Sequence, residues 1–132
     1  MKCVLVDYSG SFRNTGQASL PKRSGKFIQI RTGDTEYLVF STADLSQYHA
    51  NISERFFTDH GVWGTYNSKR DFYRIDDPAW EIVGGGAWSA DYDSKTLHLS
   101  GISQAYGRFD EAGLHTRVKA FREFHGFNVT IS

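Results

Sequence analysis

Hydrophobic residues recur at helical spacing in the segment that follows residue 45. Apolar side chains fall four residues apart at Tyr48, Ile52 and Phe56, which is the repeat of one buried helical face. We place the start of this helix at Ser46, whose hydroxyl can accept a hydrogen bond from a free backbone amide one turn on. Gly61 can take the left-handed conformation that commonly closes a helix. Two further residues could cap the same start: Ser41 and Asp44.

Other segments alternate apolar and polar residues or form short apolar runs, as strands do. Residues 26–31 alternate, Gly33 and Asp34 supply turn chemistry, and residues 37–40 are continuously apolar, so we predict two neighbouring strands. Three consecutive glycines at 84–86 lie between two further strand patterns, and they allow either close backbone approach or a bend. The predicted strands cover residues 4–6, 26–31, 37–40, 80–83, 87–92, 96–102 and 127–131.

A second helical repeat lies near the C-terminus, where Gly126 is placed to close the helix. Helices and strands do not alternate strictly along the chain. We therefore predict an α+β fold, with a mixed sheet of about six strands and two helices in a single domain over residues 1–132. The apolar positions of the second helix are Leu114, Val118, Phe121 and Phe124.

Two segments lack a regular pattern. Residues 9–24 are rich in Ser, Gly and basic side chains, which predicts a loop. Residues 58–80 interleave aromatic and basic side chains, a combination that can form a stacking groove for single-stranded nucleic acid. Fifteen basic and fifteen acidic residues cancel to a formal net charge of +0. We therefore favour an extended loop folded onto its own side chains, and we expect no nucleic-acid partner.

Length and cysteine content bound the class of protein. A chain of 132 residues fits one domain, which can remove roughly two-thirds of its unfolded surface from water. Cys3 is the single cysteine and cannot form an intramolecular disulfide. The apolar N-terminal residues meet Asp7 too early for a signal peptide, and no run approaches the length of a membrane span. We expect a soluble cytoplasmic protein without a membrane partner, and we favour a monomer.

The leading candidate for chemistry is His49, because it falls in the first turn of the first predicted helix. Backbone N–H groups there lack intrahelical partners, and the peptide dipoles present a partial positive charge that attracts phosphate. The same field disfavours protonation of the ring, so a neutral imidazole could act as a general base. A lone histidine is more often a surface or capping residue without a chemical task. Further evidence is needed to favour catalysis.

Other kinds of site have less support. The remaining histidines show no paired ligand spacing and there is no second cysteine, so we predict no metal and no cofactor. A serine nucleophile with His49 as its base stays open, although the sequence has no Gly-x-Ser-x-Gly elbow. Asp76 and Asp77 precede Pro78 and are typical of a turn. The other histidines are His60, His98, His115 and His125.

Several short blocks occur in a definite order along the chain. Residues 26–31 form an alternating strand with a lysine, residues 48–52 read Tyr-His-Ala-Asn-Ile, and the triple glycine follows at 84–86. Residues 103–107 read Ser-Gln-Ala-Tyr-Gly. Residues 118–130 form the last block, a predicted helix followed by a strand. In this order, over residues 26–132, the blocks resemble those of the phosphohistidine phosphatase family, also called the janus/ocnus family.

The resemblance implies the fold of that family and a hydrolase activity: a protein phosphatase that splits the P–N bond of phosphohistidine without metal or cofactor. It implies that His49 is the essential catalytic residue, acting as a general base, and that Lys26 adds positive charge to the catalytic site. It further implies phosphate binding by backbone amides around Ala50, with Ser103 and Ala105 opposite. The implied partner is a phosphorylated protein or a small phosphorylated ligand.

Three features depart from the family pattern. Ala87 stands where the family has an arginine directly after the triple glycine, so one cationic contact to phosphate is missing. Asn51 replaces an aspartate. The segment 58–80 is longer and more aromatic than the family's usual connection, and it could reshape the entrance to the site or dock a partner. Three arginines could replace the lost charge from elsewhere: Arg31, Arg70 and Arg108.

Two functions of different classes follow from this pattern. The first is an enzyme that hydrolyses phosphohistidine on proteins, with His49 activating water or assisting proton transfer. The second is a non-catalytic module that binds a phosphate group, a phosphoprotein or a nucleotide without turning it over, and Ala87 is its motivation. A remaining alternative is a docking protein that uses the surface of residues 63–80.

Overall fold

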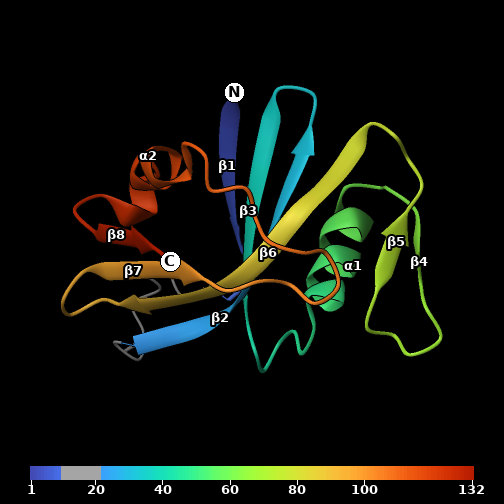
Figure 1. The fold of residues 1–132 in the computed structure, drawn as a ribbon, viewed down its shortest axis with the longest axis horizontal. Coiled ribbons are helices and arrows are strands. Elements are labelled where there is room, and N and C mark those ends of the chain that lie inside the picture. Colours follow the sequence, from blue (N-terminus) through green and yellow to red (C-terminus); the bar gives the residue numbers. More distant parts are fainter. Residues whose placement is uncertain (10–21) are drawn as a thin grey trace.

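The computed structural model describes residues 1–9 and 22–132. The two helices lie on either side of a curved sheet (Figure 1). The elements follow in the order β1 (Lys2–Asp7), β2 (Lys22–Thr32), β3 (Thr35–Thr42), α1 (His49–Asp59), β4 (Gly64–Tyr66), β5 (Tyr73–Ile75), β6 (Trp80–Asp91), β7 (Thr96–Ser100), α2 (Leu114–Lys119), a 3-10 helix (Arg122–Phe124) and β8 (Asn128–Ile131).

Six strands form one mixed sheet in the order β1-β3-β2-β6-β7-β8. β1 pairs in parallel with β3, and β8 pairs in parallel with β7, whereas the strands between them pair antiparallel. β4 and β5 form a separate small sheet beside α1 (Figure 1). Strands and helices do not alternate strictly, so the protein is a single α+β domain with a mixed sheet, as predicted.

The sheet buries apolar side chains on both faces because a helix covers each one. Phe27 and Ile28 are neighbours in β2 and both are 0% exposed, but consecutive strand residues point to opposite faces. Phe27 packs in a cluster with Leu114 of α2, and Ile28 packs in a second cluster with Ile52 of α1. Burial on both faces also explains the continuous apolar run at residues 37–40. Each such side chain contributes roughly 1.5–3 kcal/mol of hydrophobic stabilisation.

The three glycines lie inside β6, so the two strand patterns predicted on either side of them form one continuous strand. Neighbouring backbone leaves no room for side chains there. A Cβ atom at Gly84 would collide with the carbonyl oxygen of Arg108, and one at Gly86 would collide with that of Ser100. The glycines therefore allow close packing of backbone against a strand that stays extended.

Helix α1 begins at His49, so the cap predicted at Ser46 is wrong. The Ser46 hydroxyl is buried and lies 2.9 Å from the hydroxyl of Ser41, which removes it from the helix end. Tyr48 is the N-cap residue instead, and its backbone N–H donates to Asn51 Oδ1 at 2.8 Å. The side chain of Asn51, three residues after the N-cap, thus accepts from the backbone N–H group of the N-cap residue. His49 still falls in the first turn, as predicted.

The second predicted helix is shorter than its apolar pattern suggested. Phe121 has an extended backbone, with φ of −66° and ψ of 138°, and it separates α2 from the 3-10 helix. The buried positions Leu114 and Phe124 still reach one core from these two short pieces. Both closing glycines behave as predicted, since Gly61 and Gly126 have φ values of 70° and 82°.

The segment predicted as an extended loop, 58–80, contains the hairpin of β4 and β5. Asn67 organises the turn of this hairpin: its backbone N–H donates to Phe72 O at 3.0 Å, and its Oδ1 accepts from the N–H groups of Asp71 and Phe72. The loop predicted over 9–24 lies outside the described residues at 10–21, and its last three residues belong to β2.

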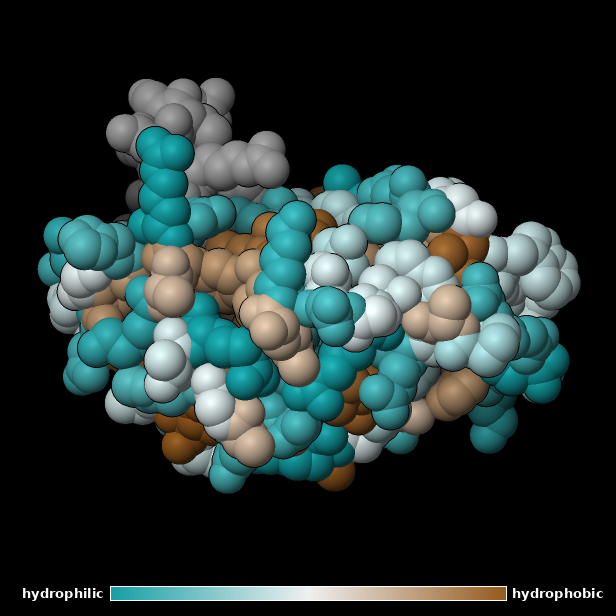
Figure 2. Space-filling view, turned by 90° about the horizontal axis from the view of Figure 1, so that it is seen from above, coloured by the Kyte–Doolittle hydropathy of each residue, from teal (hydrophilic) through white to brown (hydrophobic). Residues whose placement is uncertain are grey.

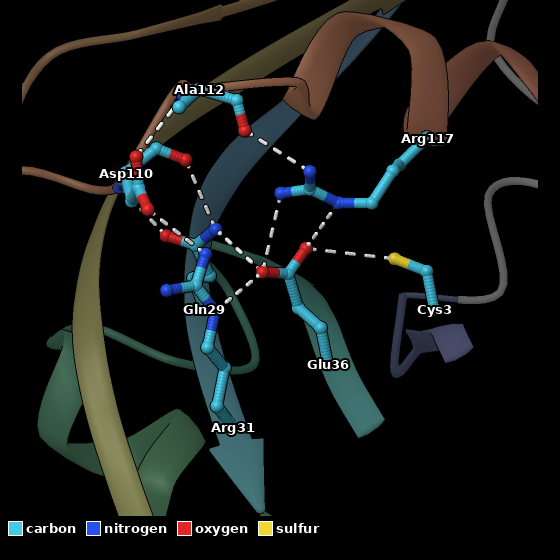
Figure 3. A network of polar contacts seen from close by, with 7 residues as sticks. All are labelled: Cys3, Gln29, Arg31, Glu36, Asp110, Ala112 and Arg117. Atoms are coloured by element: carbon cyan, nitrogen blue, oxygen red, sulfur yellow. Dashed lines mark hydrogen bonds and ion pairs between the residues drawn. The ribbon is translucent and has the colours of Figure 1, made fainter. Parts of the chain in front are cut away.

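A buried carboxylate joins the sheet to α2. Glu36 is 0% exposed, and its carboxylate accepts hydrogen bonds from Arg31 Nε at 2.9 Å, Arg117 Nε at 3.0 Å and Gln29 Nε2 at 3.0 Å (Figure 3). Arg31 also reaches Asp110 Oδ2 at 3.0 Å. The network therefore ties β2, β3, α2 and the segment before α2 together, and a buried charge with several partners avoids the cost of an unpaired one.

The outer surface is predominantly polar on the face seen in Figure 2, where a few hydrophobic residues lie between hydrophilic ones. Scattered apolar residues of this kind are normal on protein surfaces. Within residues 1–9 and 22–132, none of the helices has the length and apolar character needed to cross a membrane.

Candidate functional site

His49 is held in one orientation by the central strand of the sheet. It is the first residue of α1, and its Nε2 lies 2.9 Å from the carbonyl oxygen of Gly86 in β6. A carbonyl oxygen can only accept, so Nε2 carries the proton of a neutral ring. Nδ1 is then the nitrogen with a free lone pair. The contact therefore fixes both the direction of the ring and the atom that can act as a base.

The triple glycine makes room for this imidazole. A Cβ atom at Gly85 would lie 3.0 Å from His49 Cδ2 and 2.5 Å from the carbonyl oxygen of Phe27. Gly86 supplies the carbonyl group that accepts from His49. The sequence block 84–86 thus both admits the ring and holds it, a role that the glycines alone did not predict.

The surroundings favour the neutral form of His49. Burial lowers the pKa of His49 below the ordinary histidine value of 6.5, and the positive charge of Lys26 lowers this pKa further. The hydrogen bond to Gly86 acts in the opposite direction but is outweighed. His49 is 8% exposed, so the residue is largely enclosed, and it lines a pocket. A neutral imidazole at physiological pH suits a general base.

Lys26 and Ala87 are direct cross-strand partners in β2 and β6, so they share one face of the sheet. Ala87 is exposed and Lys26 is half-buried. None of the ion pairs among the described residues involves Lys26. An arginine at position 87 would have stood beside this lysine, so Ala87 leaves the site with one cation at this position.

His49 lines a pocket of about 790 Å³. A smaller hollow of about 420 Å³, lined by Ala87 among others, also contains Lys26 and His49. The two side chains therefore stand where these spaces meet. The His49 pocket is lined by Lys26, Gln47, Tyr48, His49, Asn67, Asp71, Phe72, Ile102, Gln104 and Ala105.

The turn at residues 103–107 also lines the pocket, through Gln104 and Ala105. Ser103 lies beneath: it is 1% exposed, its N–H donates to Gly85 O at 3.1 Å, and its Oγ accepts from Tyr106 N–H at 3.0 Å. Within the part of the chain that the structure describes, no acceptor is found for the N–H groups of Gln104 and Ala105. These two amides are therefore the donors that the turn can offer to an anion.

The structure brings three of the predicted site residues together and leaves two below the surface. Lys26, His49 and Ala105 line one pocket. Ala50 is 0% exposed and lines neither the pocket nor the hollow, and Ser103 fastens the turn to β6 from underneath. The direct phosphate contacts predicted for Ala50 and Ser103 stay predictions.

No protein-family model matches this chain, and no curated protein matches it either. The family resemblance stays a prediction.

None of the three arginines considered as replacements lines the pocket. Arg31 is paired with Glu36 and Asp110. Arg70 lies over the ring of Tyr66 at 4.2 Å, and Arg108 bonds Gly101 O, Ser132 O and Glu111. Of the described residues that line the pocket, Lys26 is thus the one with a cationic side chain.

The start of α1 is coupled to the β4–β5 hairpin through Asn51. Its Oδ1 accepts from Tyr48 N–H at 2.8 Å, and its Nδ2 donates to Tyr66 Oη at 3.2 Å. A carboxylate could accept from the same backbone amide but could not donate. An asparagine at position 51 can therefore bond both the start of α1 and Tyr66 of the neighbouring hairpin, which an aspartate could not do.

The segment 58–80 was expected to be able to reshape the entrance to the site, and its hairpin turn does line the pocket, but no sequence pattern marked which of its residues would do so. Asn67, Asp71 and Phe72 come from the hairpin turn that was predicted as part of a loop, and Gln47 precedes the helix. Their residue types gave no signal, since amides and carboxylates are common in turns. For a metal site, the described residues contain no group of three or more His, Cys, Asp or Glu side chains.

Proposed function

We propose that this protein hydrolyses the P–N bond of phosphohistidine on cytoplasmic proteins, with His49 as the general base. One observation supports this most: His49 Nε2 lies 2.9 Å from the Gly86 carbonyl oxygen, which leaves Nδ1 of a neutral ring to take a proton at the edge of a pocket. The order of sequence blocks supports it independently. On those blocks we also propose that the chain has the fold and ancestry of the phosphohistidine phosphatase, or janus/ocnus, family.

The reaction converts phosphohistidine, a phosphoramidate, and water into a free histidine imidazole and inorganic phosphate. The water oxygen forms a bond to phosphorus while the P–N bond breaks, and the bonding electron pair leaves on nitrogen. His49 Nδ1 takes one proton from the water and returns it to the departing nitrogen, and the second proton stays on the phosphate. Such proton transfer by a positioned group commonly contributes roughly 100-fold to 10,000-fold to the rate.

The phosphoryl oxygens require positive partners, because phosphoryl transfer depends mainly on positioning and on charge stabilisation. Lys26 supplies a cation on the pocket wall, and the backbone N–H groups of Gln104 and Ala105 supply donors from the 103–107 turn. The N–H groups at the start of α1 add the partial charge of a helix end. Ser103 supports the turn by accepting from Tyr106, and so acts as a positioning residue.

The test is release of inorganic phosphate from a synthetic phosphohistidine peptide, compared with the spontaneous rate in buffer. The proposal predicts turnover with many phosphates released per protein molecule, and weaker turnover when free phosphate is added as a competitor. A rate equal to that in buffer, at every peptide concentration tried, would contradict it. Addition of a chelator serves as a control for trace metal, and the rate is expected to stay unchanged.

A second function is favoured by two specific observations. Ala87 leaves no second cation beside Lys26, and Asp71 places a carboxylate on the wall of the same pocket. A site with this charge balance could hold a phosphorylated ligand without hydrolysing it. Calorimetry with phosphopeptides separates the two functions: tight binding without phosphate release supports the binding module, whereas release supports the enzyme.

A further inference from the structure

The β4–β5 hairpin supplies a wall of the His49 pocket. Asn67, Asp71 and Phe72 belong to the turn between β4 and β5, and all three line the pocket that also contains Lys26 and His49. The hairpin lies outside the main sheet, beside α1 (Figure 1). A segment that is separate from the fold's core but lines its candidate site is well placed to select ligands.

This wall is fastened on two sides. Tyr106 Oη donates to Tyr73 O at 2.7 Å and accepts from Tyr73 N–H at 3.2 Å, which joins β5 to the 103–107 turn. On the other side, Tyr66 Oη donates to Glu54 of α1 at 2.9 Å. The hairpin is thus bonded both to the 103–107 turn and to α1. Its side chains therefore keep a defined position relative to His49 without help from a ligand.

Asp71 carries the negative charge of this wall. Its Oδ1 accepts from Asn67 Nδ2 at 2.6 Å, a contact with a neutral amide that leaves the charge in place. None of the ion pairs within residues 1–9 and 22–132 involves Asp71. Among the described residues that line the pocket there is thus one cation, Lys26, and one carboxylate, Asp71, that makes no ion pair with another described residue. Free phosphate is attracted by the first and repelled by the second.

Apolar surface lies beside these charges. Ile102 is 62% exposed and Tyr48 is 42% exposed, and both line the pocket together with Phe72. Such surface suits the methylene stem of a long basic side chain, whose charged end stays in water or meets a carboxylate. An aromatic ring also attracts the cation itself.

We propose that Asp71 is a specificity residue, which selects phosphorylated peptides that carry a lysine or arginine next to the phosphorylated side chain. This rests on the proposed function, because it takes the Lys26 and His49 end of the pocket as the phosphoryl site. The charges of the ligand complement those of the pocket: its phosphoryl group lies toward Lys26, and its cationic side chain lies toward Asp71. A peptide with a glutamate at the flanking position places like charges together and binds more weakly.

The test compares three phosphohistidine peptides that differ only in the flanking residue, which is lysine, alanine or glutamate. For the wild-type protein, kcat/KM is expected to fall in that order, with lysine preferred over alanine roughly threefold to fivefold, the scale of an exposed ion pair. Asp71→Asn keeps the size of the side chain and its contact with Asn67, and it is expected to remove the preference. Asp93→Asn makes the same change of charge at an exposed turn outside the pocket, and it is expected to retain the preference.

Binding of the same three peptides, made with a non-hydrolysable phosphohistidine analogue, separates this inference from the proposed function. If the wild-type protein hydrolyses the peptides but Asp71→Asn keeps the lysine preference, the role of Asp71 is overturned and the phosphatase stands. If no peptide is hydrolysed but the analogues bind with a preference that depends on Asp71, the phosphatase falls and the selection by Asp71 stands. Failure of every analogue to bind overturns both.

Discussion

The imidazole of His49 packs so closely on Gly85 that a Cβ atom at this glycine would lie 3.0 Å from Cδ2 of the ring. The position of the candidate base therefore depends on the absence of a side chain at position 85 of β6. Residue 85 is also enclosed from the other side, because the same Cβ atom would approach the backbone oxygen of Phe27 to 2.5 Å. The triple glycine and the histidine act as one structural unit.

Gly85→Ala is expected to destabilise the protein and to displace His49. Extra atoms in a packed site typically cost about 1–3 kcal/mol, and the backbone oxygen of Phe27 cannot move as easily as the imidazole. Denaturant unfolding measures the first effect, and phosphate release measures the second. Glu81→Ala, an exposed site on the same strand, is the control and should change neither. A fully active, fully stable Gly85→Ala variant would contradict the packing described above.

The pH dependence of activity should reflect the lowered pKa of His49. Activity requires the neutral ring, so kcat/KM should fall on the acidic side only below pH 6.5, the ordinary histidine value. A midpoint above 6.5 would show that His49 is not the titrating base. Measurement of kcat/KM from acidic to neutral pH decides between the two.

Folding stability, like activity, should fall at acidic pH because of His49. Because the folded pKa of His49 lies below that of the unfolded chain, the unfolded chain takes up the proton first as the pH falls through 6.5. His49 then destabilises the fold at acidic pH and contributes no pH dependence well above 6.5. The unfolding free energy of wild type relative to that of His49→Gln should therefore fall on the acidic side and stay constant well above pH 6.5. An equal difference at all pH values would contradict the burial of the ring.

The buried carboxylate of Glu36 should matter more for stability than any exposed ion pair. Glu36→Gln keeps the shape but leaves Arg31 and Arg117 without their shared anion, and loss of one partner from a buried pair typically costs about 3–5 kcal/mol. Glu111→Gln breaks the exposed bridge to Arg108 and should cost about 1 kcal/mol or less. Chemical denaturation of both variants tests the contrast, and equal losses would contradict it.

Ala87→Arg should strengthen binding of inorganic phosphate, because it places a second cation beside Lys26 on the same face of the sheet. A gain of roughly threefold to tenfold is expected at low ionic strength, and it should shrink as salt is added. Ala79→Arg adds the same charge at an exposed position outside the pocket and should leave the affinity unchanged. Calorimetry measures both. An equal gain in the two variants would point to net charge as the cause and not to the site.

Much of the fold could be predicted from periodicity. The alternating and continuous apolar runs located the strands because burial on one or both faces decides which residues a strand can use. The errors came where backbone packing decides the structure. Two strands were predicted on either side of the glycines at 84–86, but these glycines lie within a single strand, where neighbouring backbone approaches them closely. Ser46 was expected to cap a helix, but its hydroxyl instead contacts the hydroxyl of Ser41, near the end of β3.

The candidate site was predicted less completely. His49 was located by its place at a helix start, and Lys26 and Ala105 by resemblance, and these three line one pocket. The hydrogen-bond acceptor of His49 is the backbone oxygen of Gly86, and a backbone acceptor cannot be predicted from a sequence pattern. Asp71 and Asn67 reach the pocket only because a hairpin folds across from α1, and long-range placement of this kind has no local signal.

The central claim is that His49 performs the chemistry, and the most direct measurement is the rate of phosphate release from a phosphohistidine peptide by His49→Ala and His125→Ala. His125 is exposed and lies outside the pocket, so the two variants differ in the site alone. The account predicts a loss of roughly 100-fold or more for His49→Ala, with His125→Ala as active as wild type. Equal rates for His49→Ala and wild type, with both proteins folded, would contradict it.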